Sequence, residues 1–228
     1  FDIVDSNPTA SHTYAASGAT YTVRIAGTAD RFGSNSTETL RRVNSFGDLS
    51  LSSLETAFEN HTALTQVDSA FPSSVTNMRG IFASVTTNPT GMEAWDTSNV
   101  SNMRAIFYNA ANFNRDISGW DTSGASTLFD AFNGAAAFNQ DIGDWDVSGV
   151  SAFLGAFRNA TSFDQDLSDW DVSNVGGGMT GMAYMFENAT SYGGDMSEWC
   201  VINQGSRPTG FSNGTQPTTI EPLWGSCP

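Results

Sequence analysis

The feature that most constrains this chain is a repeat with a period of about 25 residues. The segment FNQDIGDWDVSGV (138–150) returns upstream as FNRDISGWDTSGA and downstream as FDQDLSDWDVSNV. One bulky aromatic residue marks each repeat, at steps of 25, 24, 25, 25, 25, 29 and 25 residues: Phe46, Phe71, Trp95, Trp120, Trp145, Trp170, Trp199 and Trp224. Such a fixed period is typical of stacked repeat units, each burying its apolar face only against its neighbours.

Two local patterns predict the conformation of each repeat. Phe138 and Ile142 are an even number of residues apart, which would place both on the inner side of a short strand. The segment VSAFLGAF (150–157) spaces its apolar residues as a helix does, but is long enough only for a turn or two. We therefore expect a repeat solenoid, mainly β with short helical or 3₁₀ turns.

Composition narrows the classes of partner. The formal charge is −15, and the nine basic residues are all Arg, so a phosphate-tracking surface and a nucleic-acid partner are not expected. No run of 18 apolar residues occurs, so the chain is not expected to span a membrane. The first residues, FDIVDSNPTA, lack the basic-then-apolar pattern of a signal peptide, which suggests a mature or trimmed chain.

The cysteines and the sequons point to an extracellular setting. Cys200 and Cys227 favour a disulfide over two free thiols, because the Ser/Thr/Gly-rich composition is typical of extracellular proteins and oxidising compartments permit the bond. Such a bond would pin the last repeat. Potential N-glycosylation sites begin at Asn35, Asn60, Asn99, Asn159, Asn188 and Asn213. A chain this rich in Asn, Ser and Thr also produces such sequons by chance.

The repeat resembles that of the BspA-like leucine-rich repeat surface proteins. The segment FNQDIGDWDVSGV, followed by AF or MF, is similar to the FNQDISxWDVSNVTNMxxMF repeat of the DUF285-like branch, found in bacterial surface proteins and mycoplasma lipoproteins. The resemblance covers Leu40 to Trp224. It implies a leucine-rich-repeat-like stack of about seven to eight coils, displayed outside the cell, with adhesion as the suspected role. It supplies no catalytic residues.

A second resemblance concerns the N-terminal part. The segment HTYAASGATYTVRIAG (12–27) is similar to the closing strands of a PKD-like, immunoglobulin-type module. We therefore expect residues 1–39 to form a partial β segment and cap. Residues 40–228 then form the solenoid with a C-terminal disulfide cap. The sequence departs from the family repeat at Asn88, after Trp120 and at Cys200.

Two rows of carboxylates recur with the repeat. The first row is Asp96, Asp121, Asp146 and Asp171. Two interpretations stay open for it: each Asp caps its own corner, helped by the Ser two residues on, or Ca²⁺ lies between successive carboxylates. No other cofactor is expected. A second surface would present an acidic, flat face that either binds a ligand or is simply solvated: Asn114, Asp116, Asn139, Asp141, Asp164 and Asp166, continued by Asp195.

Catalysis finds little support in the sequence. A hydrolase triad needs a positioned His, and the two His, His12 and His61, read as ordinary surface or turn residues. Carboxylate pairs for glycoside hydrolysis stay open because acids abound. Yet these acids recur because the repeat recurs, whereas an active site would break it. We expect no enzyme.

The functional hypothesis is a non-enzymatic extracellular or cell-surface protein that binds through an extended surface. Its partner would be a protein or glycan on another cell or matrix. The alternative is a structural subunit of an extracellular filament, appendage or virion surface, made of copies of this chain. Its motive is the β segments near the N-terminus, at Tyr14 and at Tyr21 to Ile25, whose unpaired edges a neighbouring subunit could complete.

Overall fold

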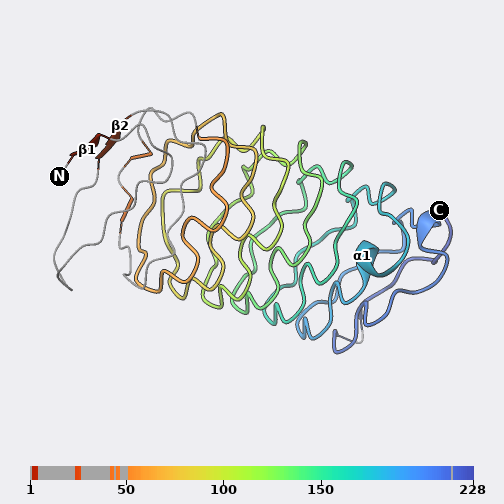
Figure 1. Ribbon diagram of the computed structural model, residues 1–228. Coiled ribbons are helices and arrows are strands. Elements are labelled where there is room, and N and C mark those ends of the chain that lie inside the picture. The colour runs from red at the N-terminus through yellow and green to blue at the C-terminus, as the bar shows by residue number, and fades with distance from the viewer. Residues whose placement is uncertain (1, 5–23, 27–41, 44, 47–50, 217) are drawn as a thin grey trace.

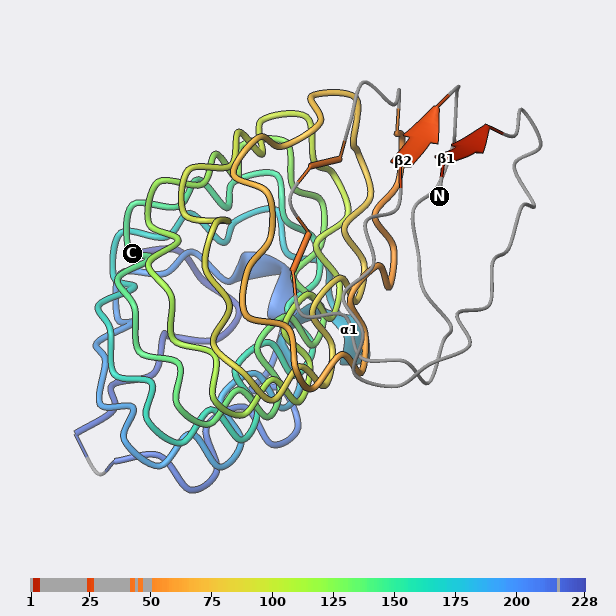
Figure 2. The same cartoon turned by 90° about the vertical axis from the view of Figure 1, so that its left-hand side faces the viewer.

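The repeats stack side by side along one axis. The structure is a computed structural model that describes residues 2–4, 24–26, 42–43, 45–46, 51–216 and 218–228. Figure 1 shows successive turns of the chain laid against one another from the N-terminal to the C-terminal end, and Figure 2 looks at the same stack from one end. Regular elements are few: β1 (Asp2–Val4), β2 (Arg24–Ala26), α1 (Met179–Met182) and a 3₁₀ helix, η1 (Ile202–Gln204).

The predicted fold class, a mainly β, leucine-rich-repeat-like solenoid with short helical or 3₁₀ turns, is wrong. Within the described part of residues 42–228 there is no β-strand, and the helical residues are those of α1 and η1. Neighbouring repeats instead share isolated parallel bridges, such as Asn77↔Asn102 and Asn102↔Thr127. The repeats are built of turns and irregular backbone.

Side chains take the place of the expected β ladder. The amide of Asn139 donates to the Asn114 side-chain oxygen at 2.9 Å, and the amide of Asp164 donates to that of Asn139 at 2.9 Å. A ladder needs these amides to meet backbone carbonyls of the next strand. Because an amide side chain accepts them instead, the segment at Phe138 faces inward as expected but pairs with no strand.

The expected helical turn is replaced by alternating hydrogen bonds. The amides of Phe107 and Asn109 donate to carbonyls of the next repeat, at Ala131 (2.8 Å) and Asn133 (2.7 Å). The amide between them, that of Tyr108, donates back to Ala105 at 3.1 Å. Ala105 and Asn109 both have φ of 55°, so the turn contains two left-handed residues four positions apart. A helix needs consecutive right-handed residues, and this alternation interrupts it.

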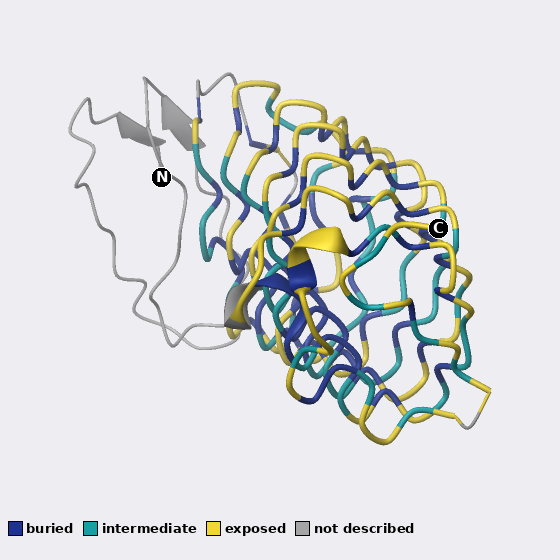
Figure 3. Cartoon of the chain, turned by 90° about the vertical axis from the view of Figure 1, so that its right-hand side faces the viewer, coloured by how far each residue is buried: buried dark blue, intermediate teal, exposed yellow. Residues whose placement is uncertain are grey.

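The aromatic residues stack at the repeat interval, as their spacing predicts. The ring centroids of Trp95 and Trp120 are 6.1 Å apart, and those of Trp120 and Trp145 are 6.4 Å apart, with rings within 7° of parallel. Phe107 and Phe132 stack in the same way at 5.5 Å. These side chains belong to one buried core that runs the length of the repeats, with exposed residues along its outer edges (Figure 3).

A hydrogen bond explains why the corner residue is Trp. In five of the six Trp residues the indole N–H reaches back to a backbone carbonyl one repeat earlier, whereas Trp224 donates to the nearby Glu221 side chain. The Trp145 Nε1 donates to Ile117 at 3.2 Å, and Trp170 Nε1 donates to Ile142 at 3.1 Å. The same bond is made by Trp95, Trp120 and Trp199. A buried indole needs an acceptor, so the residue both fills the core and ties two repeats together.

The structure describes only part of the predicted N-terminal β segment. β1 and β2 pair in parallel, with Asp2 opposite Arg24 and Val4 opposite Ala26. β2 overlaps the strand expected at Tyr21 to Ile25. Most of the PKD-like segment, and the boundary expected between residues 39 and 40, lie outside the described residues. The domain division therefore stays a prediction.

Candidate functional site

The first Asp row consists of caps. The Asp146 Oδ1 accepts the Ser148 amide at 3.0 Å and the Ser148 hydroxyl at 2.6 Å. Asp96, Asp121 and Asp171 accept the amide two residues on in the same way. The hydroxyl and amide of Ser148 hold the pKa of Asp146 below its usual value, because both stabilise the charged form. The cap interpretation is confirmed.

The second row is capped in the same way. Asp116 accepts from the amide of Ser118 at 3.0 Å, Asp141 from that of Gly143 at 3.0 Å, and Asp166 from that of Ser168 at 2.9 Å. The hydrogen bonds from Ser118 and Ser168 lower the pKa of Asp116 and Asp166. We call the two rows together the acidic corner: Asp96, Asp116, Asp121, Asp141, Asp146, Asp166, Asp171 and Asp195.

The remaining members of the predicted ligand surface join the repeats. Asn88, Asn114, Asn139 and Asp164 accept, in order, the amides of Asn114, Asn139, Asp164 and Gly193 at 2.9–3.0 Å. Gln140 and Gln165 add side-chain bonds to the same acceptors. The structure thus brings all six predicted residues together on one strip. Each has an oxygen occupied by a backbone amide, and a ligand role for this strip stays a prediction.

The geometry of the acidic corner gives calcium no support. Among the described residues, no group of three or more His, Cys, Asp or Glu side chains is placed to hold a metal ion. The negative charge of Asp146 disfavours ionisation of Asp171 in the next repeat, and so opposes the lowering of the Asp171 pKa by its hydrogen bonds. Such repulsion is expected between like charges one repeat apart that have no cation between them.

A second surface was missed by sequence reasoning. It lies on the turn that follows the bridge positions, and most of its residues differ from repeat to repeat, although Arg79 and Arg104 occupy equivalent positions. We call it the Arg–aromatic strip: Arg79, Arg104, Phe129, Asp130, Arg158 and Tyr184. The Arg104 guanidinium lies over the Phe129 ring at 4.1 Å, and that of Arg158 lies 5.1 Å from the Tyr184 ring centroid.

Ion pairs hold the two ends of this strip. Arg79 Nη1 lies 3.0 Å from Glu55, and Arg158 Nε lies 2.6 Å from Glu187. Their side chains remain partly exposed. Pairs of this kind contribute little to stability at a surface, so they orient the guanidinium groups more than they hold the fold.

Asp130 is the unusual carboxylate of the strip. It is half-buried, and desolvation raises its pKa despite the Asn133 hydrogen bond and the charges of Arg104 and Arg158. Asn133 Nδ2 donates to its Oδ1 at 2.8 Å. In the next repeat the same position is Gly155, where a Cβ would lie 2.4 Å from that oxygen. The sequence did contain a signal for Asp130: the repeat reads FDAF at 129–132, whereas the neighbouring repeats read RAIF and LGAF at the same position.

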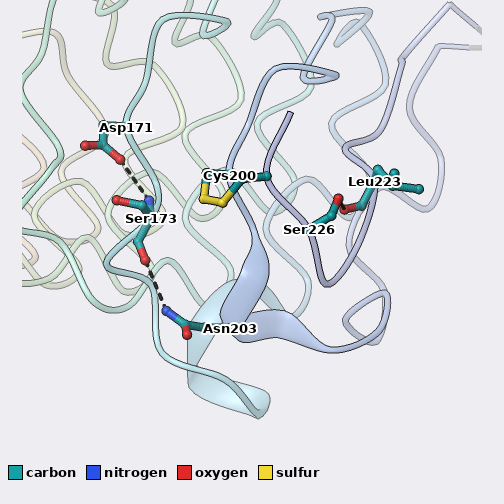
Figure 4. Close-up of a disulfide and its surroundings, with 7 residues drawn as sticks. Asp171, Ser173, Cys200, Asn203, Leu223 and Ser226 are labelled. Carbon is teal, nitrogen blue, oxygen red and sulfur yellow. Dashed lines mark hydrogen bonds between the residues drawn. A yellow bond between two sulfur atoms is a disulfide. The ribbon is translucent and has the colours of Figure 1, made fainter.

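The predicted disulfide is present. Cys200 and Cys227 are bonded, with Cα atoms 4.1 Å apart. Figure 4 shows Cys200 on the turn next to Asp171, whose cap on Ser173 is drawn beside it. The bond ties the end of the chain to the preceding repeat, as the sequence suggested.

Comparison with known families agrees with the repeat. The family model described as "Mycoplasma protein of unknown function, DUF285" matches residues 52–153, 76–199 and 126–219. The chain belongs to the DUF285 family. The three matches overlap, as expected when one motif is repeated out of step with the length of the family model. No curated protein and no solved structure shows a significant match.

The sequons of this DUF285 protein differ in their surroundings. Asn60 and Asn213 are exposed. The side-chain nitrogens of Asn99, Asn159 and Asn188, the atoms that would carry a glycan, donate to Ser73, Asn133 and Asn159 at 3.0, 3.3 and 3.0 Å. Asn35 lies outside the described residues. Glycosylation stays a prediction at all six.

The structure bears on two further predictions, one about the histidines and one about membrane spanning. His61 is buried, with 1% exposure, so it is not the surface residue that the sequence suggested, and His12 lies outside the described residues. In the described part of this DUF285 protein, no helix is both long and apolar enough to cross a membrane.

Proposed function

We propose that this chain is a non-enzymatic extracellular surface protein that binds a protein or glycan partner through the Arg–aromatic strip. The observation that carries the proposal is the division of residues between two tasks. Residues that recur with the repeat are engaged in the core, the caps and the Asn ladder. Residues that break the repeat, such as Phe129, Asp130 and Arg158, gather on this strip.

The chemistry of the strip suits recognition. Arg and aromatic side chains dominate the energetics of many binding surfaces. Here Phe129 and Tyr184 offer ring faces, Arg104 and Arg158 offer planar donors, and Asp130 offers a half-buried acceptor. Their spread over several repeats suits an extended partner. The disulfide supports an oxidising, extracellular setting.

A glycan and matrix-protein array tests the proposal. We expect the wild-type chain to bind a subset of the array, and Arg104→Ala with Tyr184→Ala to lose that binding. Asp144→Asn, which changes an exposed acid outside the strip, is the matched control and should bind as wild type. An array silent for the wild type, or equal binding by the strip variant, would refute the proposal.

The alternative is a structural subunit that assembles into filaments. It is favoured by β1 and β2, because an isolated two-stranded sheet is marginal on its own and has two edges that a neighbouring subunit could extend. Light scattering after size exclusion, followed by negative-stain microscopy, decides between the two. Fibres that disappear when residues 2–4 are deleted would favour the alternative, and monodisperse single copies would remove it.

A further inference from the structure

The acidic corner changes character at its C-terminal end. Ile220 is bridged to Asp195, so it occupies the position of an acid in the last repeat. Leu223 follows three residues later, as Glu198 follows Asp195. Cys200 stands where the first row would carry its next Asp after Asp171. Three successive acidic positions thus become apolar at one end of the molecule.

These apolar side chains are exposed. Leu223 is 76% exposed and Ile220 is 49% exposed, whereas the stacked aromatic residues of the core, such as Trp145 and Phe132, are buried. Single exposed apolar residues are ordinary on a protein surface. Leu223 lines a hollow together with the exposed Cys227, and Ile220 lies three residues earlier in the chain; at positions where the repeat otherwise carries acids, they make a patch. We call Ile220, Leu223 and the Cys200–Cys227 disulfide the apolar end patch.

The patch borders a small hollow. The hollow has a volume of about 140 Å³ and is lined by Ser197, Trp199, Leu223, Ser226, Cys227 and Pro228. Ser226 is fixed there, because its carbonyl accepts the Val201 amide at 2.9 Å and its hydroxyl donates to Leu223 at 2.6 Å. Figure 4 shows Leu223 and Ser226 together near the disulfide. A single apolar side chain would fit against this wall.

Charge surrounds the patch. Glu198 lies between Ser197 and Trp199 in the chain, and both of these line the hollow. Asp195 lies beside Ile220, and Asp171 lies on the turn next to Cys200. All three acids are exposed. An apolar anchor that docks here therefore enters a negative field.

We propose that the apolar end patch docks a segment of a partner protein in which an apolar anchor is flanked by Arg or Lys. Leu223, Ile220 and the disulfide would cover the anchor, and the surrounding acids would pair with its basic neighbours. A second copy of this chain is a poor occupant, because each copy has a formal charge of −15 and the facing acids would repel. This site is separate from the Arg–aromatic strip.

Peptide binding tests the inference. The probe is a labelled peptide with one central Leu or Phe flanked by Arg, measured by fluorescence polarisation at low and at physiological salt. Its match carries Glu in place of Arg. We expect the Arg peptide to bind, the Glu peptide not to bind, and added salt to weaken binding, since exposed charges are screened.

Variants locate the site. Ile220→Ser with Leu223→Ser should weaken binding of the Arg peptide at least about tenfold, which corresponds to about 1.4 kcal/mol. Asp195→Asn with Glu198→Gln should weaken it and flatten its salt dependence. Tyr108→Ser removes another exposed apolar side chain, 38% exposed and several repeats away, and should bind as wild type. Unchanged melting midpoints show that the variants are folded.

Three results would overturn the inference. The first is equal binding of the Arg and Glu peptides, or binding of neither. The second is unchanged affinity in the Ile220 and Leu223 double variant. The third is a wild-type dimer in light scattering that this double variant abolishes, which would make a second copy the occupant. The array measurement with strip variants is independent, so failure here leaves the strip proposal standing.

Discussion

At the scale of the residue, each recurring side chain combines a fixed place in the repeat, in the core or at the surface, with a hydrogen bond to the backbone. Trp145 fills the core and bonds to the repeat before it. Asn139 faces outward and accepts an amide from the repeat after it. Asp146 is exposed and caps its own turn. Conserving such a residue from repeat to repeat preserves the fold, without any need for a ligand.

The first prediction concerns the indole bond. Trp145→Phe should lower the free energy of unfolding by about 1–3 kcal/mol, because it removes one buried hydrogen bond and some ring volume. The Ile117 carbonyl keeps its bond from the Trp120 amide, so the loss is not larger. Denaturant unfolding measures it. Trp224→Phe, at a half-buried end position, is the control with a smaller expected change; equal losses would contradict the role of the internal indoles.

The second prediction concerns pH. The folded Asp146 has a pKa below its ordinary value of 3.8, so its cap adds stability above that pH and loses it as the pH falls through the lower, folded pKa. Asp146→Asn keeps an oxygen acceptor but no titration. Wild type should therefore lose about 0.5 kcal/mol or less relative to this variant below pH 3.8, a small change because the group is exposed. Parallel acid titrations of the two chains check the direction; a gain by wild type would contradict it.

At the scale of the element, the repeat depends on left-handed residues. In the turn after the bridge position, Gly80, Ala105, Asp130 and Gly155 all have φ between 54° and 61°. That conformation turns alternate amides toward the next repeat and the others back along the chain. The pattern produces stacking without strands.

The third prediction tests this backbone. Gly155→Ala should destabilise the fold by about 2 kcal/mol, because φ is +61° and the new Cβ would lie 2.4 Å from Asp130 Oδ1. Gly119→Ala is the matched control: nothing lies within 4 Å of its Cβ position, and its change should stay within about 0.5 kcal/mol. Thermal and denaturant unfolding report both. Similar effects at the two positions would contradict the left-handed turn.

Several features could be predicted from the sequence at this scale. The constant spacing of Trp120, Trp145 and Trp170 predicts the stacking. Each Trp then lies at the same place in its repeat and contacts the Trp of the next one. The Asp-x-Ser motif predicts the caps. The backbone could not be predicted, because an inward Phe138 and Ile142 are equally compatible with an irregular segment whose amides bond to side chains of the neighbouring repeat. The prediction that Asn114 faces outward was correct. The hydrogen bond that its side chain accepts from Asn139 could not be predicted, because the donor belongs to the neighbouring repeat.

The strip was missed for a related reason. Arg104 and Phe129 occupy equivalent positions in successive repeats, but an Arg and a Phe share no motif. They become neighbours only when one repeat is laid on the next. Periodicity locates what recurs, and these residues are the exceptions to it.

At the scale of the whole molecule, one elongated core is closed at its C-terminal end by a covalent bond. The disulfide spans a sequence separation of 27 residues. The bond joins the last two repeats that the structure describes. The formal charge of −15 opposes close approach of two copies of the chain.

The fourth prediction removes that bond. Replacing Cys200 and Cys227 together with Ser should lower the free energy of unfolding by about 3 kcal/mol in the chain-entropy model. The loss should be confined to the last repeat, so protease cleavage should increase after residue 199 while residues 51–170 stay resistant. Limited proteolysis with mass spectrometry checks this. Loss of protection along the entire chain would mean that the bond holds more than the end.

The central claim is that hydrogen bonds and aromatic stacking between successive repeats make one continuous body, which leaves only departures from the repeat free to bind. Residue-resolved amide hydrogen exchange tests it most directly. The amides of Phe107, Phe132 and Phe157 each donate to the following repeat at 2.8 Å and should exchange slowly and together. Fast exchange at these three amides, or protection that differs widely among them, would contradict the claim.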